Sequence, residues 1–338
     1  MSAPQQTTVA IIGAGIAGAA CAQVLQDAGL AVALLDKGRG AGGRLATRRI
    51  TLEDGRQAQV DHGAQYFTAR SHGFREALKG WIAAGAAAPW PARLGTLSAG
   101  HFTPGADAET RYVGTPRMSA LGGHMAGPAA RYGARVARLE KADHGWRLLD
   151  EAGALLVQAA QVVLAVPAPQ AMELLAPVAT PAMLAAVAGV ETAPCWAVML
   201  VFDGPLSLPF DGAFVAGSPV RWIARDAAKP GRPGAPEAWL GHATPEWSVD
   251  HLEAAPETAQ PLLEAAFRSA TGCDTPALHV AVHRWRYALA SAAGHAFSRA
   301  FHAGRRCRDT LCRHTAHECT WWPHGGTGGA LWRPRGPA

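Results

Sequence analysis

Two glycine-rich turns near the N-terminus offer the clearest chemistry in this sequence. The first turn follows a short apolar run at residues 9–12 and leads into an alanine-rich segment typical of a helix. Glycines at this spacing permit a tight turn, a close approach of backbone N–H groups to a pyrophosphate, and close packing of the helix on a strand. The turn therefore predicts a phosphate site at a helix N-terminus. Its residues are Gly13, Ala14, Gly15, Ile16, Ala17 and Gly18.

An acidic residue lies where such a turn needs a partner for ribose. A second apolar run at residues 30–35 ends on Asp36. A carboxylate at this point accepts a hydrogen bond from a ribose hydroxyl, and it repels a 2′-phosphate. The order of strand, glycine turn, helix, strand and acid predicts a dinucleotide-binding fold far more specifically than the glycines alone.

A second glycine-rich loop, residues 37–44, follows the acid directly and favours FAD over NAD. It holds four glycines, Gly43 among them, together with Lys37, Arg39 and Arg44. Glycines allow a close backbone approach, and an arginine can bind a diphosphate through two parallel hydrogen bonds. A domain that binds NAD would continue directly into its next helix here. The loop therefore predicts FAD as the cofactor.

The segment 60–67 sets another glycine among polar and aromatic groups and predicts a wall for a flat ring system. The residues expected to form this wall are Gly63, Ala64, Gln65 and Tyr66. His62 precedes them, and its side chain is interpreted as a hydrogen-bonded loop histidine rather than a catalytic group. Flavin chemistry does not require such a group, because the ring accepts the hydride while the protein orients the substrate and excludes water.

Together these motifs resemble the FAD-dependent amine-oxidase-fold flavoproteins, and within them the bacterial renalase-like group. The likeness runs from about residue 8 to about residue 290 and includes the segment 283–287. It implies oxidation of a small reduced substrate, a dihydropyridine isomer of NAD(P)H or, as in the wider family, an amine. Hydride would pass to the flavin and electrons to molecular oxygen, giving hydrogen peroxide. The residues expected on the substrate side are His242, Arg284, Trp285 and Tyr287.

The resemblance also implies an α/β fold of the two-domain kind shared by amine oxidases and p-hydroxybenzoate hydroxylase. A Rossmann-type FAD-binding domain would comprise residues 1–73 and 110–172. A substrate domain with a mixed sheet, inserted between these pieces, would comprise residues 74–109 and 173–292. The cofactor domain is then discontinuous in sequence.

Hydrophobic spacing predicts the elements that position these groups. Apolar residues at helical spacing predict a helix over residues 74–92, and turn residues at 143–145 and 150–153 predict a β-meander. A strand over residues 132–138 would put Val136 near an adenine. Further strands are expected at residues 161–166, 195–202, 220–225, 238–244 and 278–287.

Composition excludes several classes of protein. The chain of 338 residues is 49% hydrophobic and 17% charged, which permits a sizeable core and excludes wholesale disorder. Residues 299–338 hold seven arginines and two acidic residues, which account for the whole net charge of +5. The neutral body argues against a nucleic-acid partner, and the lack of a long apolar helix or basic leader argues against a membrane or export. We therefore expect a cytoplasmic protein with a small-molecule substrate.

The last segment, residues 293–338, does not fit the rest. It lacks the Gly-Asp pair and final helix with which flavoproteins of this fold normally close, and it crowds Arg, Cys, His and Trp without apolar periodicity. We interpret it as a frameshifted C-terminus. The alternatives are an Arg-rich nucleic-acid tail, a divergent closing element, or a zinc site made from Cys307, Cys312, His314, His317 and Cys319.

Two hypotheses of a different class follow for the whole chain. The first is a non-catalytic product with a flavin fold that cannot hold its cofactor because its last segment is wrong. The second is a plain NAD(P)-dependent dehydrogenase, since the first glycine turn alone does not distinguish NAD from FAD. A flavin absorption spectrum would separate both hypotheses from a working flavoenzyme.

Overall fold

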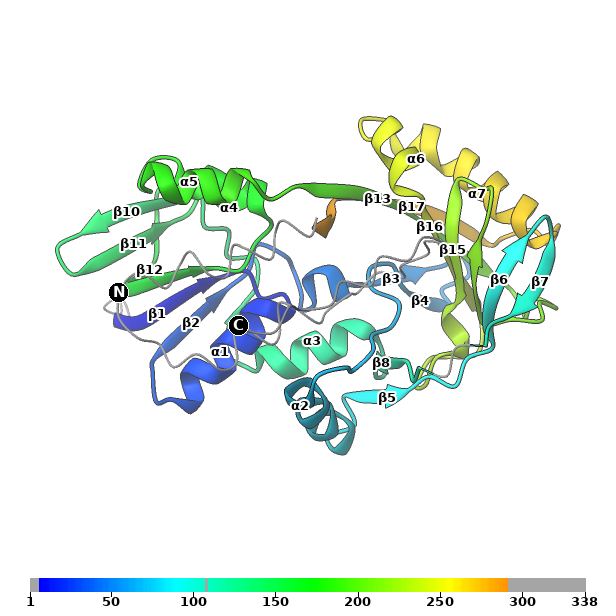
Figure 1. Ribbon diagram of the computed structural model, residues 1–338, viewed down its shortest axis with the longest axis horizontal. Helices are drawn as coiled ribbons and strands as arrows, with labels where there is room; N and C mark the ends of the chain where they lie inside the picture. The colour runs from blue at the N-terminus through cyan, green and yellow to red at the C-terminus, as the bar shows by residue number, and fades with distance from the viewer. Residues whose placement is uncertain (1–5, 107–108, 291–338) are drawn as a thin grey trace, which may run out of the picture.

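The computed structural model describes residues 6–106 and 109–290, and it has two lobes, each built on one large sheet (Figure 1). The first lobe holds a six-stranded sheet with the strand order β10-β11-β12-β1-β2-β9. In this sheet β1 pairs in parallel with β12 on one side and with β2 on the other. The bounds of the strands are β1 Gln6–Ile12, β2 Val32–Leu35, β9 Ala130–Arg131, β10 Arg138–Ala142, β11 Gly145–Leu149 and β12 Leu155–Leu164.

Small residues let the first helix lie directly on this sheet. Helix α1 (Ile16–Asp27) buries Gly18 together with three alanines of its first two turns. A Cβ atom on Gly18 would lie 1.8 Å from the carbonyl oxygen of Gly13, so only glycine fits at this point. Helix α3 (Met118–Ala126) packs against α1, and both contribute to one hydrophobic core with the nucleotide sheet. The predicted strand, turn, helix and strand are therefore confirmed.

The return of the chain to the nucleotide sheet is also confirmed. Strand β12 pairs with β1 as far as Leu164, which lies opposite Ile12. Turns at residues 143–144 and 151–152 join β10, β11 and β12 into the expected meander. The last residues of β12 are half-buried rather than buried, which differs from the apolar character of their sequence.

The strand expected over residues 132–138 is wrong. Only Ala130–Arg131 pair with β2, and the chain then turns at Gly133, whose φ is +68°. The amides of Gly133 and Ala134 donate to the carbonyls of Gly38 and Asp36, at 2.8 and 2.9 Å. These bonds tie the segment to the loop after β2 and prevent it from extending as a strand. Val136 is nevertheless buried in the core on the other side of the nucleotide sheet.

The second lobe holds a seven-stranded sheet with the strand order β17-β13-β16-β15-β14-β6-β7. All four strands predicted in this lobe are confirmed, and β13 lies between β16 and β17 with both pairings antiparallel. Helix α7 (Pro256–Thr271) shares a core with this sheet. The bounds of the strands are β6 Leu94–Ser98, β7 His101–Pro104, β13 Thr192–Phe202, β14 Gly212–Val215, β15 Val220–Arg225, β16 Glu237–Ala243 and β17 His279–Ala290.

The helix expected over residues 74–92 is shorter than predicted. Helix α2 spans His72–Ala83, and the Ser71 hydroxyl caps it by accepting a hydrogen bond from the Phe74 amide at 3.2 Å. The chain leaves the helix at Gly85, whose φ of +69° belongs to the left-handed region. A short strand then follows, so Trp90 lies in a loop beyond the helix.

A β-hairpin lies between the two lobes. Its strands are β3 (Thr47–Thr51) and β4 (Gln57–Asp61), and its apolar residues Ile50 and Val60 share a core with residues of β13 and β16. The hairpin therefore joins the second glycine loop to the substrate sheet. The other elements are β5 Ala87–Pro89, β8 Tyr112–Gly114, α4 Ala168–Leu175, α5 Pro181–Ala188, α6 Pro245–Asp250 and the short 3₁₀ turns η1 Gly43–Leu45 and η2 Asp226–Ala228.

Two further findings concern the part of the chain that the structure describes. None of its helices combines the length and the apolar character needed to cross a membrane. Its three cysteines are free thiols, and burial raises the pKa of Cys195 to about 12. The proposed zinc ligands and the whole segment 293–338 lie outside the described residues.

Candidate functional site

The first glycine turn has the geometry of a phosphate cradle. Gly13 has a φ of +103°, and a Cβ atom there would lie 2.4 Å from the Ala165 carbonyl oxygen. Gly15 is the N-cap of α1, and a Cβ atom on it would meet nothing within 4 Å. The first amides of a helix have no partner within the helix, so open space at this N-terminus suits an anion. The turn fits the dinucleotide diphosphate that its sequence predicts.

Asp36 is fixed beside this turn at the end of β2. Its Oδ2 accepts from the Ala14 amide at 2.7 Å, and its Oδ1 accepts from the Gly38 amide at 2.6 Å. Burial and the Asp36 charge together raise the pKa of the neighbouring Tyr132. An ionised carboxylate has about four acceptor positions, so two remain for a ribose diol. The position agrees with the predicted role of Asp36.

The second glycine loop comes back onto the first. Gly42 forms a parallel bridge with Gly15, and a Cβ atom on Gly43 would lie 3.2 Å from the Gly15 Cα. Gly42 has a φ of +117°, which favours glycine. The structure therefore brings the two glycine motifs together at one point.

The cations of this loop are exposed, and one of them reaches the other lobe. Lys37, Arg39 and Arg44 all lie on the surface. Arg44 Nη1 donates to the Ala288 carbonyl at 3.0 Å, near the end of β17. This contact keeps the guanidinium beside the glycine loops.

The segment 63–66 divides into two halves. The Ala64 amide donates to the Arg44 carbonyl at 2.9 Å, and a Cβ atom on Gly63 would lie only 2.0 Å from the same oxygen. Gln65 and Tyr66 instead turn into the interior, where 1% and 9% of their surfaces are exposed. The backbone of Gly63 and Ala64 therefore lies against the second glycine loop, as a wall beside that loop requires. The side chains of Gln65 and Tyr66 instead pack in the interior behind this backbone.

Gln65 belongs to a buried ionic cluster that the sequence did not indicate. Lys229 Nζ donates to Asp226 Oδ1 at 2.7 Å, to Asp61 Oδ2 at 3.2 Å and to the Gln65 side-chain oxygen at 3.2 Å. Arg232 also donates to Asp61 Oδ2, and the side chains of these four charged residues are at most 1% exposed. We call Asp61, Asp226, Lys229 and Arg232 the ionic cluster. Its formal charges cancel.

The pKa values of the two carboxylates in the ionic cluster shift in opposite directions. Burial by itself would raise the pKa of Asp61, but the charges of Lys229 and Arg232 outweigh burial and lower this pKa. Burial and the neighbouring Asp61 charge raise the pKa of Asp226.

A second buried group, which we call the imidazole cluster, consists of His62, His242, His283 and Trp285. The His62 carbonyl accepts two hydrogen bonds, from Trp285 Nε1 at 2.9 Å and from His242 Nε2 at 3.1 Å. Because a carbonyl only accepts, His242 carries its proton on Nε2. The His62 ring stacks on Trp285 with centroids 5.1 Å apart and meets His283 edge-on at 4.8 Å. The cluster lies beside Gly63, since a Cβ atom there would be 3.4 Å from Trp285.

These histidines are neutral near pH 7. Burial, together with the charges of His283 and Arg48, lowers the pKa of His62 to about 3. Burial lowers the pKa of His242 to about 3 as well. Burial, and then the charge of Arg48, lower the pKa of His283 to about 4. The hydrogen bonds at His62 described above go to its carbonyl, whereas its ring Nδ1 is buried and has no hydrogen-bond partner among the described residues.

The four residues expected on the substrate side do not converge. His242 is fully buried and meets Trp285 only at the His62 carbonyl. Arg284 donates to the carbonyls of Leu252 and Ala254, and its guanidinium lies 5.4 Å from the centre of the Trp196 ring. Side chains alternate along a strand, so Arg284 faces away from the imidazole cluster. Tyr287 is half-buried two residues beyond Trp285.

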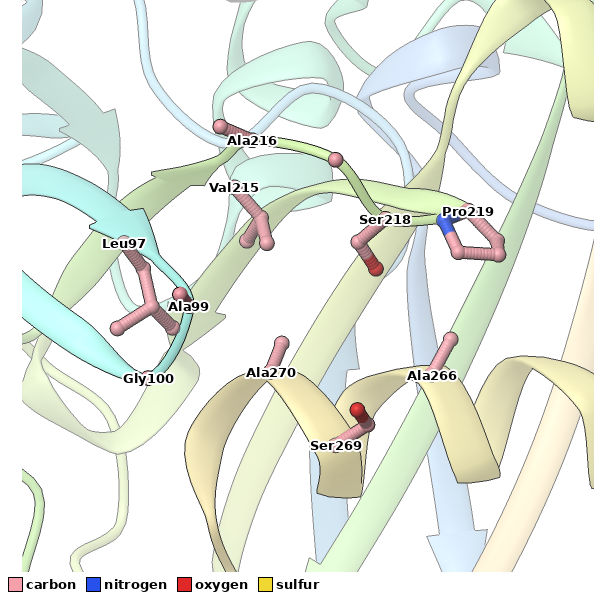
Figure 2. Close-up of a pocket in the computed structure, with 11 residues that line it drawn as sticks. Leu97, Ala99, Gly100, Val215, Ala216, Ser218, Pro219, Ala266, Ser269 and Ala270 are labelled. Atoms are coloured by element: carbon pink, nitrogen blue, oxygen red, sulfur yellow. The ribbon is translucent and has the colours of Figure 1, made fainter.

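A cavity of about 360 Å³ lies in the second lobe, away from both glycine turns (Figure 2). It is bounded by the turn between β6 and β7, the turn between β14 and β15, and helix α7. Its lining consists mainly of small apolar residues, with the hydroxyls of Ser218 and Ser269 as its polar side-chain groups. No titratable side chain lines it, so it contributes nothing to the site described above.

Residues 117–326, more than half of the chain, match the family of flavin-containing amine oxidoreductases. The chain belongs to this family. Residues 11–80 also match the family of NAD(P)-binding Rossmann-like domains, in agreement with the first glycine turn. The protein is thus a flavin-dependent oxidoreductase, which argues against a plain NAD(P)-dependent dehydrogenase. The matched range extends into the segment beyond residue 293.

Solved structures support the same two-domain fold. A putative protoporphyrinogen oxidase from Exiguobacterium sp. 255-15 superimposes with a TM-score of 0.67 and 15% sequence identity, over 87% of this chain and 90% of that one. Wild-type putrescine oxidase with bound putrescine superimposes with a TM-score of 0.58 and 15% identity, over 79% and 82%. A double mutant of putrescine oxidase gives 0.61 and 15%, over 82% and 84%.

Proposed function

We propose that this flavin-dependent oxidoreductase is of the renalase-like type and oxidises a dihydropyridine isomer of NAD(P)H. The proposal rests mainly on the chemistry of the imidazole cluster beside Gly63. Its groups are aromatic and its histidines are neutral near pH 7, and the exposed cation Arg48 acts on both His62 and His283. A planar, anionic dinucleotide suits such a wall.

An amine is the less favoured substrate for the same reason. Amines are cationic near pH 7 and gain from an unpaired carboxylate. The carboxylate closest to the imidazole cluster is Asp61, and Lys229 and Arg232 already neutralise it. The substrate wall therefore offers a cationic amine little electrostatic stabilisation.

The proposed cofactor form is FAD. The α1 N-terminus and Arg44 would hold its diphosphate, Asp36 its adenosine ribose, and Lys37 and Arg39 would lie over the same end. Val136, in the core below Asp36, would contact the adenine side. A bound flavin supplies the hydride acceptor for the reaction. The backbone at 63–64 and Trp285 would orient the substrate ring, and molecular oxygen would take up the electrons as hydrogen peroxide.

Anaerobic mixing tests the substrate class. Purified protein is mixed with dihydropyridine isomers of NADH or NADPH in one series, and with putrescine in a matched series. We expect the isomers to bleach the flavin absorption band within one turnover, and readmitted oxygen to restore it with one equivalent of peroxide. Bleaching by putrescine alone would assign the protein to the amine oxidases proper.

An arginine variant tests the cofactor site itself. Arg44→Ala removes a charge-assisted bidentate contact, so FAD affinity should fall by about 1.5–3 kcal/mol. Arg49→Ala is the matched control, because Arg49 is an exposed arginine on the adjoining strand β3. Equal affinities in the two variants would remove Arg44 from the site. Tight NADP binding that competes with FAD would contradict the assignment of Asp36.

A second candidate, a chain that holds flavin weakly because its last segment is wrong, rests on the edge of β12. Strand β11 pairs with β12 only from Leu155 to Ala159, whereas β1 pairs with it as far as Leu164. Among the described residues no strand covers the remaining edge, and its apolar side chains are half-buried. An uncovered edge favours aggregation and leaves the cofactor lobe incomplete.

Resequencing tests this candidate directly. If residues 293–338 come from a shifted frame, a single-base correction near codon 293 should yield Gly-Asp followed by a helical pattern. The corrected protein should then purify yellow and the present chain colourless. A present chain that purifies with stoichiometric FAD would refute the frameshift and identify the segment as an unfamiliar closing element.

A further inference from the structure

We infer that Asp61 is a positioning residue for the cofactor: it caps helix α3 and, through that helix, holds the second glycine loop against Gly15. The inference rests on the proposed function only in assigning FAD to these loops. The positioning itself is a property of the chain, and it is carried by contacts between β3, β4, α3 and the loop at 42–44.

The N-terminus of α3 is capped from the hairpin rather than from its own sequence. Its N-cap residue, Arg117, makes no side-chain capping bond. The Met118 amide instead donates to Asp61 Oδ1 at 3.0 Å, and the Ser119 amide donates to the Thr47 hydroxyl at 3.2 Å. Two of the amides that a helix leaves unpaired are thus satisfied by β3 and β4. A negative charge at this end also interacts favourably with the helix dipole.

Helix α3 in turn touches the glycine loop backbone to backbone. A Cβ atom on Gly122 would lie 2.7 Å from the Gly42 Cα, and one on Gly42 would lie 3.3 Å from the Ser119 Cα. On its far side, the loop meets Gly15 with similar closeness at Gly43. Because the closest contacts in both interfaces are between backbone atoms of glycines, a shift of α3 is passed directly to the loop and to the turn at Gly15.

Asp61 itself has little freedom to move. The Thr47 hydroxyl donates to Oδ1 at 2.6 Å, and Lys229 and Arg232 bind Oδ2. Both cations come from the loop that follows η2 in the substrate lobe. The ionic cluster therefore connects a loop of the substrate lobe, through one carboxylate and one helix, to the loop proposed to bind the cofactor.

The test compares two buried carboxylates, each replaced by its amide. Asp61→Asn weakens the cap, whereas Glu237→Gln changes a carboxylate that is 3% exposed and accepts from the Leu206 amide and from Trp239 in the substrate sheet. Hydrogen exchange of the apoprotein is measured at residues 42–46 and 118–122. The loop amides of Leu45 and Ala46, bonded to Gly42 and Gly43, report on the loop directly.

We expect Asp61→Asn to speed exchange in both segments and to weaken FAD binding, each at least about tenfold, as loss of a charged hydrogen bond predicts. Glu237→Gln should leave both quantities within about twofold. Unchanged exchange at residues 42–46 in Asp61→Asn would overturn the inference, even if the protein lost stability.

A second variant covers the case in which Asp61→Asn does not fold. Thr47→Val keeps the side-chain shape, removes the acceptor of the Ser119 amide, and should speed exchange at residues 118–122 and 42–46 in the same sense. If wild-type protein bound no FAD at all, the proposed function would fail, whereas the exchange comparison would still decide whether Asp61 holds the loop.

Discussion

Asp61, the last residue of β4, and His62, which follows it, face two different regions of the interior. Polar side chains are paired as charges in one region and are neutral in the other. Asp61 points into the ionic cluster, where two carboxylates meet two cations and every charge is paired. His62 points into the imidazole cluster, where three histidines have lost their charge. Because successive side chains of a strand point to opposite faces, one strand borders both regions.

The difference shows how burial selects between pairing and deprotonation. A buried charge is costly unless it is paired, and a group that can release or take up a proton escapes the cost by becoming neutral. Lys229 and Arg232 have acidic partners within hydrogen-bonding distance, and these ion pairs offset the cost of burying the charges. The imidazole cluster has Arg48 nearby instead, which adds to the burial in lowering the pKa of His62 and His283.

The largest effect is expected from breaking the ionic cluster. Lys229→Met removes the cation closest to Asp226 and one of the two cations that bind Asp61, so the free energy of unfolding should fall by about 3–5 kcal/mol. Urea unfolding at pH 7 measures this loss. Lys79→Met is the control, because Lys79 forms a single ion pair with Glu76 and 72% of its side chain is exposed.

The control should change stability by less than about 0.5 kcal/mol. A loss of under about 1 kcal/mol in Lys229→Met would mean that the ionic cluster contributes no more than a surface pair. The charge pairs of the ionic cluster would then not account for the stability of this buried region.

The next largest effect is the pH dependence that the imidazole cluster contributes to stability. The pKa of His62 and of His242 is about 3 in the folded chain, against an ordinary 6.5. Between these values the unfolded chain binds more protons than the folded chain, so the free energy of unfolding falls as the pH falls. The slope is about 1.4 kcal/mol per pH unit for each histidine, so acidification from pH 7 to pH 5 should cost about 2 kcal/mol each.

A pair of glutamine variants isolates this dependence. His242→Gln removes one titrating group, so its free energy of unfolding should fall by about 2 kcal/mol less between pH 7 and pH 5 than that of the wild type. His72→Gln should fall as much as the wild type, because 85% of the His72 side chain is exposed. The raised pKa of Asp226 acts in the opposite sense, so the comparison uses the difference between wild type and each variant. The same fall in the free energy of unfolding between pH 7 and pH 5 in all three proteins would show that burial does not lower the pKa of His242.

The sequence predicts well what depends on local backbone chemistry. Gly13, Gly15 and Asp36 lie as expected, because a glycine turn between a strand and a helix has few alternative geometries. Four of the seven strands in the substrate sheet were predicted, because their apolar runs are long. The error at residues 132–138 arose because bonds to the Asp36–Gly38 loop override local strand propensity.

What the sequence could not predict depends on long-range pairing. Lys229 and Arg232 lie in a segment rich in Pro and Gly that is typical of an exposed loop, yet both side chains are fully buried. Their partner Asp61 is more than 160 residues away in the chain. Gln65 turns inward for the same reason, since its partner is Lys229. No local pattern carries this information.

The smallest effect tests how the neutral side of β4 is held in place. Trp285→Phe keeps an aromatic ring but removes the Nε1–H that donates to the His62 carbonyl, while His242 still donates to that oxygen. One neutral hydrogen bond of this kind contributes about 1 kcal/mol. Trp247→Phe is the control for lost ring area, because Trp247 is also half-buried and stacks on a histidine, His251, with centroids 3.9 Å apart.

Urea unfolding should therefore show Trp285→Phe to be less stable than Trp247→Phe by about 1 kcal/mol. In flavin-loaded protein, Trp285→Phe should also shift the visible absorption band, since the freed His62–Gly63 peptide borders the proposed ring wall. Combined with His242→Leu, which has no side-chain donor, the loss should exceed the sum of the single losses, because the carbonyl then has neither donor and is buried unpaired. Strictly additive losses would show that the two donors act independently, and that His62 is held by its ring contacts rather than by its carbonyl.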